Sequence, residues 1–90
     1  MYTVKFTNKF KKNYKSMIKR GKDISLLDDI IDKLMNGVKL DEKYHDHELT
    51  GTWKGHRECH IQPDWLLVYY VENDILVLTL VNTGSHSDLF

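Results

Sequence analysis

The fold is decided by WLLVYYV-END-ILVLTLV, the stretch that runs from Trp65 to Val81. Two nearly continuous apolar runs flank three polar residues, Glu72-Asn73-Asp74, which are typical of a hairpin turn. Strands this apolar usually lie at the centre of a sheet or are covered on both faces. The stretch therefore predicts a central β-hairpin, and neither run is long enough to span a bilayer.

Upstream of the hairpin the pattern changes to one strand and two helices. Residues 2–6 alternate and predict a short strand. Thr7 is positioned to cap a helix that runs to about Arg20 and stops at Gly21. The apolar stripe expected on this helix comprises Phe10, Tyr14, Met17 and Ile18.

A second, more clearly amphipathic helix can begin at Asp23 or Ser25, with Asp28 completing a capping box, and end at Gly37. Because the connection between the helices is short, we expect an antiparallel helix pair.

Further along, residues 42–49 predict a loop plus a short strand. Residues 53–61 predict a longer strand, which the turn Gln62-Pro63-Asp64 ends. Alternation along that strand places Arg57 and Cys59 on one face and Glu58 and His60 on the other. The whole chain, residues 1–90, thus predicts a single α+β domain with an N-terminal strand and a two-helix hairpin. The hairpin would pack on a mostly antiparallel sheet of four to five strands, leaving the opposite sheet face open.

Thirteen basic and thirteen acidic side chains give a net charge of zero, which on its own argues against a nucleic-acid partner. The total conceals a split, because residues 1–22 carry eight basic side chains and no acidic one. The side of the first helix opposite the apolar stripe carries Lys12, Lys15 and Lys19. This side is either an ordinary solvated surface or a polyanion-binding face.

The compartment can also be inferred from the sequence. Cys59 is the single cysteine, which excludes an intramolecular disulfide and fits a reducing compartment. The polar first ten residues lack the apolar core of a signal peptide. We therefore expect a cytoplasmic protein with no membrane partner.

Five histidines all follow residue 44, and three interpretations compete for them. They are scattered structural residues, or His45 and His47 bind a metal, or the set performs acid–base catalysis without metal. If the last two strands form a hairpin, the end of the second comes close to Asp64. That pairing would gather His60, Asp64 and His86, with Lys54 and Arg57 as nearby cations. Such a group suits proton transfer at a phosphate.

Two aromatic residues have alternative roles. Trp65 is either a core residue at the start of a strand or part of the substrate site. Phe90, the last residue, either docks into the core or stacks on a base and places His86.

Four motifs occur together and in order. They are HDHEL at 45–49, LTGTWKGHR at 49–57, CHIQPDW at 59–65 and TGSHSDLF at 83–90. This set resembles the YafQ-type toxins of the RelE superfamily. The resemblance is specific over residues 45–90, whereas the N-terminal half matches mainly in its strand-helix-helix order.

The resemblance implies a bacterial type II toxin, an mRNA interferase that cleaves mRNA at the ribosomal A site without a metal or cofactor. The implied partners are the 70S ribosome, mRNA and a cognate antitoxin of ribbon-helix-helix type, with operator DNA reached only through the antitoxin. The family's catalytic positions carry over to His47, His60, Asp64, His86 and Phe90. His86 would be the general acid, Asp64 or His47 the base, and His60 would orient or stabilise the phosphate.

One position departs from the family pattern. Many relatives have arginine just before Thr-Gly-x-His, and this chain has Asn82, which carries no charge. Either Arg57 or Lys54 supplies the missing charge, or the chain is a slower nuclease. The substrate-binding set expected from the sequence is Lys54, Arg57, Trp65 and Asn82. The alternative functions are a gyrase-binding inhibitor of the same fold and a weakly active toxin that serves mainly as a corepressor.

Overall fold

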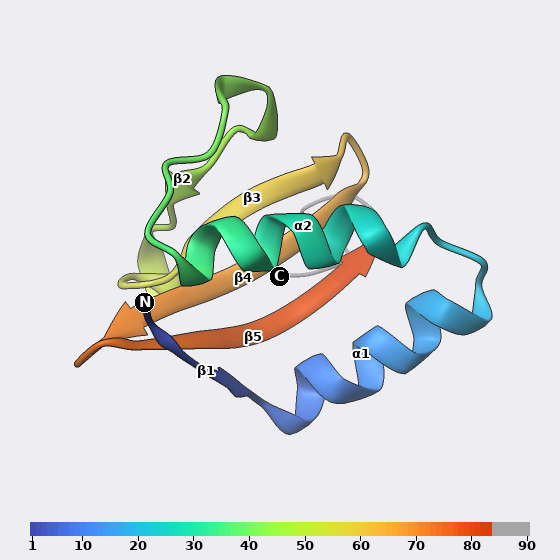
Figure 1. The fold of residues 1–90 in the computed structure, drawn as a ribbon, viewed down its shortest axis with the longest axis horizontal. Helices are drawn as coiled ribbons and strands as arrows, with labels where there is room; N and C mark the ends of the chain where they lie inside the picture. The colour runs from blue at the N-terminus through green and yellow to red at the C-terminus, as the bar shows by residue number, and fades with distance from the viewer. Residues whose placement is uncertain (84–90) are drawn as a thin grey trace.

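The structure, a computed structural model, describes residues 1–83 (Figure 1). Its elements in chain order are β1 (Thr3–Phe6), α1 (Asn8–Lys19), α2 (Ile24–Met35), the 3-10 turn η1 (Glu42–Tyr44), β2 (His47–Glu48), the 3-10 turn η2 (Gly51–Trp53), β3 (Arg57–Gln62), β4 (Trp65–Glu72) and β5 (Ile75–Thr83). The predicted order of elements is confirmed, including the short strand within residues 42–49.

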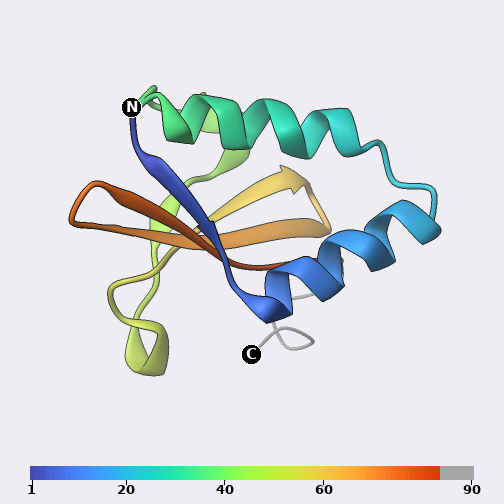
Figure 2. The same ribbon diagram turned by 60° about the horizontal axis from the view of Figure 1, so that its bottom comes forward.

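The five strands form one sheet in the order β1-β5-β4-β3-β2. β1 runs parallel to β5, and every other pair is antiparallel. Both helices bury their apolar sides against the same face of this sheet, so the predicted α+β architecture is confirmed. Figure 2 shows the helices meeting at their short connection and then diverging.

The predicted caps explain where the helices begin. Thr7 Oγ1 accepts a hydrogen bond from the backbone N–H of Phe10 at 3.0 Å and donates one to the carbonyl of Thr79 at 2.5 Å. Thr7 therefore starts α1 and also ties it to β5. Of the two candidates for the second cap, the structure uses Asp23, whose carboxylate accepts from the backbone N–H of Ser25 at 3.1 Å.

The stripe predicted for α1 needs one correction. Phe10 and Met17 are buried, but Ile18 is 54% exposed. Because α1 packs along β5, its inward face is turned towards Asn13, whose side-chain oxygen accepts a hydrogen bond from the N–H of Val81 at 3.3 Å. The buried stripe therefore includes a polar residue that satisfies the backbone of the sheet.

The strand predicted for residues 53–61 begins only at Arg57. Gly51 and Gly55 adopt φ values of +69° and +92°, which an extended strand does not contain, so the chain forms a 3-10 turn before it enters the sheet. The hairpin turn is also tighter than predicted. Asn73 and Asp74 both have positive φ, as a two-residue hairpin turn requires, and Glu72 belongs to β4.

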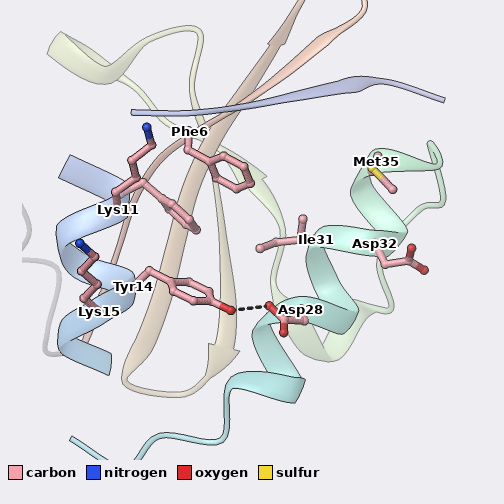
Figure 3. A pocket seen from close by; sticks show the side chains of 9 residues that line it. Phe6, Lys11, Tyr14, Lys15, Asp28, Ile31, Asp32 and Met35 are labelled. Atoms are coloured by element: carbon pink, nitrogen blue, oxygen red, sulfur yellow. Dashed lines mark hydrogen bonds between the residues drawn. The ribbon is translucent and has the colours of Figure 1, made fainter. Parts of the chain in front are cut away.

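The divergence of the helices leaves an apolar groove of about 520 Å³ between them. Figure 3 shows Phe6 and Tyr14 on one side of the groove and Ile31 and Met35 of α2 on the other. The Tyr14 hydroxyl donates a hydrogen bond to the carboxylate of Asp28 at 3.1 Å, which links the two helices across the groove. The groove is built from the helices and β1, so it does not belong to the open face of the sheet.

Candidate active site on the open sheet face

Two rows of side chains cross the sheet face that the helices leave open. In one row His47, Glu58, Val68 and Leu80 lie opposite one another on β2, β3, β4 and β5. In the second row His60, Leu66 and Asn82 do the same on β3, β4 and β5. Residues directly opposite across strands share a face. The register therefore brings His47, His60 and Asn82 to one surface.

Glu58 lies between the two histidines and is completely buried. Its Oε1 is 3.6 Å from Nε2 of His47 and 3.5 Å from Nε2 of His60. The ring of His45 also approaches His60, with 5.7 Å between the ring centroids. A buried carboxylate with two imidazoles pointing at it is the most unusual electrostatic feature of this face.

The outer nitrogen of each ring is held by the backbone. Nδ1 of His47 lies 2.6 Å from the carbonyl oxygen of His45, and Nδ1 of His60 lies 3.2 Å from the carbonyl oxygen of Pro63. Both rings are therefore fixed at two points, as catalytic imidazoles require. Asp64, which follows Pro63, is exposed in the turn between β3 and β4.

The segment before β2 is anchored from the helix-covered side. The Tyr69 hydroxyl lies 2.8 Å from each carboxylate oxygen of Asp46, and Nε of Arg57 lies 3.2 Å from Oδ1 of the same residue. Burial, reinforced by the hydrogen bond to Asp46, raises the pKa of Tyr69, so the phenol keeps its proton and remains a donor. This anchor fixes the backbone that leads into His47.

The predicted convergence at one end of the sheet is confirmed as far as the structure describes it. Trp65 at the start of β4 pairs with Thr83 at the end of β5, so the chain after residue 83 departs next to the turn that contains Asp64. His86 and Phe90 lie outside the described residues. Their predicted roles remain predictions.

Three residues of the expected substrate-binding set lie elsewhere. Trp65 is fully buried on the helix-covered face beneath Lys22, so the core alternative is the correct one and its assignment to the substrate site is wrong. Arg57 lies opposite Tyr69 on that same face and contacts Asp46 there.

Lys54 precedes β3 and lines a separate hollow with His56 and Tyr70, at the opposite end of the strand from Asp64. These placements follow from strand register, which the sequence pattern alone did not establish. Neither Lys54 nor Arg57 is therefore positioned to replace the charge that Asn82 lacks.

Glu58 was missed as a functional residue. Alternation along the strand had placed it on the same face as His60, and a carboxylate two residues from a candidate catalytic histidine on one strand face was the available signal. Its complete burial could not be read from the sequence, because Glu58 is covered by residues distant along the chain.

The remaining expectations concern the basic helix face, metals and membranes. Lys12, Lys15 and Lys19 are exposed on α1, as predicted. Within residues 1–83, no group of three or more His, Cys, Asp or Glu side chains is arranged to hold a metal ion. In the same part of the chain, no helix is long and apolar enough to cross a membrane.

The fold and the site together define the class: a small RelE-like α+β toxin domain, with helices on one sheet face and titratable side chains on the other. Comparison with known proteins specifies the family. Residues 2–90 match the family model of the bacterial YafQ toxin of type II toxin–antitoxin systems. The chain belongs to the YafQ family.

Individual relatives agree. The mRNA interferase toxin YafQ of Escherichia coli K12 is 35% identical over 88 residues, which cover 97% of this chain and 94% of that protein. A copper-bound mutant toxin from Helicobacter pylori superimposes with a TM-score of 0.92 at 41% identity, over 100% of both chains. YafQ in the E. coli DinJ–YafQ complex superimposes with a TM-score of 0.88 at 33% identity, over 100% of this chain and 99% of that one.

Proposed function

We propose that the chain is an mRNA interferase, an endoribonuclease that cleaves mRNA at the A site of the translating ribosome. The observation that carries this proposal is the pair His47 and His60, fixed around Glu58 on the open face beside the Asp64 turn. The curated name of the E. coli relative, mRNA interferase toxin, supports it.

The chemistry is an internal transfer at phosphorus. A base removes the proton from a ribose 2′-hydroxyl, the new 2′-oxygen–phosphorus bond forms and the bond to the 5′-oxygen breaks. An acid then supplies a proton to that leaving oxygen. The products are a 2′,3′-cyclic phosphate and a 5′-hydroxyl. We assign the acid to His86, the base to Asp64 or His47, and the positioning of the base or of His86 to Phe90.

The ribosome would supply most of the affinity for the substrate. Lys12, Lys15 and Lys19 form an exposed basic face on α1, and lysines of this kind bind RNA phosphates in a salt-dependent manner. Because the chain as a whole is neutral, free RNA would be bound weakly. Cleavage would then depend on the ribosome, in the cytoplasm.

An antitoxin is the second proposed partner. The E. coli relative was solved in complex with DinJ, which its title calls part of a toxin–antitoxin complex. We expect a cognate antitoxin of ribbon-helix-helix type to bind this chain directly and to connect it to operator DNA.

The decisive test is cleavage of mRNA on purified translating ribosomes, with RNA ends mapped by primer extension. We expect codon-phased cuts with the parent protein and their loss with His86→Ala, while the His86→Ala protein still binds the antitoxin. Phased cleavage by His86→Ala at the parent rate would overturn the assignment of His86. Absence of cuts with the parent, together with inhibition of DNA gyrase, would instead support the gyrase-binding alternative.

A further inference from the structure

We propose that Glu58 is a positioning residue that holds His47 and His60 in their doubly protonated form, and that these two cations replace the arginine missing at position 82. The catalytic half of this inference rests on the proposed function. The electrostatic half concerns the free protein and can be tested without the ribosome.

The first argument is the donor and acceptor inventory around the two rings. Nδ1 of His47 faces a carbonyl oxygen at 2.6 Å and its Nε2 faces the carboxylate of Glu58 at 3.6 Å. His60 repeats the arrangement, with a carbonyl oxygen at 3.2 Å and the same carboxylate at 3.5 Å. Carbonyl and carboxylate oxygens only accept hydrogen bonds, so each ring is matched when both of its nitrogens carry a proton.

The second argument is the burial of Glu58. Its side chain is fully inaccessible to solvent, and an ionised carboxylate in such a place is stabilised only by opposite charge or by several donors. Two imidazolium rings supply both. The three side chains then carry a net charge of +1 on the open face, next to the turn that leads to Asp64.

The third argument is the position of the other cations. Arg57 points to the helix-covered face and pairs with Asp46, and Lys54 lies at the far end of β3. Asn82 shares a cross-strand row with His60 but has no charge. A scissile phosphate bound on this row would therefore meet its positive charge in His47 and His60.

Other charged and titratable groups surround the two rings. Asp46 precedes β2 and is held by Arg57 and Tyr69, Glu48 of β2 pairs in register with Arg57, and Asp64 is exposed in the turn after β3. Asp29 of α2, Lys43 and Tyr44 of η1, and His45 line the hollow beside His60. Among the contacts described for the two rings, Glu58 is the carboxylate that faces both of them.

This arrangement settles the choice of base in favour of Asp64. A doubly protonated imidazole has no lone pair with which to accept the 2′-hydroxyl proton, so His47 is not the base. The exposed carboxylate of Asp64 remains for that role. Cleavage should then fail at alkaline pH, where the two rings lose their extra protons.

The test is nitrogen NMR of the histidine side chains in the free protein at pH 7. We expect both ring nitrogens of His47 and His60 to show the shifts of protonated nitrogen in the parent. In Glu58→Gln the doubly protonated fraction should fall about threefold or more. Glu48→Gln, which removes an exposed carboxylate from β2, is the matched control and should leave both rings unchanged.

Neutral rings in the parent at pH 7, or rings unaffected by Glu58→Gln, would overturn the proposal. The parent spectrum decides the first point even if the Glu58→Gln variant fails to fold.

Cleavage on ribosomes tests the catalytic half. Glu58→Gln should lower kcat about ten- to a hundredfold with a smaller change in KM, and should move the pH profile towards acid. Adding Asn82→Arg to Glu58→Gln should restore part of the lost kcat, because it supplies a cation on the same row. A loss of activity with an unchanged pH profile and no rescue would show a merely structural role. If the parent does not cleave at all, the proposed function fails, and the NMR result still decides the role of Glu58.

Discussion

Replacing Tyr69 by phenylalanine should destabilise the protein and loosen the segment that carries His47. Tyr69 is 3% exposed, and its hydroxyl lies 2.8 Å from both oxygens of the Asp46 carboxylate. Phenylalanine keeps the ring in place and removes only the donor. A hydrogen bond to a charged group contributes about 1.5–3 kcal/mol, so we expect a loss of about 2 kcal/mol in the free energy of unfolding.

The assay is equilibrium unfolding in urea, followed by tryptophan fluorescence. With a slope of about 1 kcal/mol per molar urea for a domain of this size, the midpoint should fall by about 2 M. Tyr70→Phe is the matched control, because Tyr70 is the next residue of β4, is only partly buried and packs its ring on His56. That substitution should change the free energy by less than about 0.5 kcal/mol.

The same two variants connect stability to the site. Asp46 immediately precedes His47, so loss of its partner should also reduce ribosome-dependent cleavage at temperatures where Tyr69→Phe is still folded. Equal midpoints for Tyr69→Phe and Tyr70→Phe would refute the reasoning, since they would mean that the contact with Asp46 contributes nothing to the folded state.

Three further outcomes are expected. Burial raises the pKa of the Cys59 thiol above its ordinary value of 9.0, so the folded chain keeps a proton that the unfolded chain loses; stability should be intact below about pH 9 and fall as pH rises further, by up to about 1.4 kcal/mol per pH unit, and Cys59→Ala should flatten that decline in urea titrations. Thr7→Ala should cost about 1–2 kcal/mol in thermal unfolding and Thr7→Ser much less, because serine keeps the capping hydroxyl; equal costs would argue against the cap. Changing Lys12, Lys15 and Lys19 together to glutamine should weaken ribosome binding and reduce its salt dependence while leaving urea unfolding unchanged; an unaltered salt slope would exclude this face from the contact.

Local patterns were sufficient for the elements and for the family. The apolar runs at 65–71 and 75–81 predicted the central hairpin, Thr7 predicted the first helix cap, and the motifs from His45 onward indicated the YafQ-type toxins. These features depend on neighbouring residues and on short spacings, which the sequence displays directly. The local predictions that were wrong, such as the inward side of Ile18, depended on how an element is rotated against its neighbours.

The site depended on contacts between distant segments. Register between β2, β3, β4 and β5 put His47, His60 and Asn82 on one face and turned Arg57 to the other. The same packing buried Trp65 and enclosed Glu58 between two histidines. By itself the sequence determined which titratable residues the chain has, its elements and its family. Only the tertiary structure decided which of these side chains meet, because a one-residue change in strand register reverses the face of every side chain.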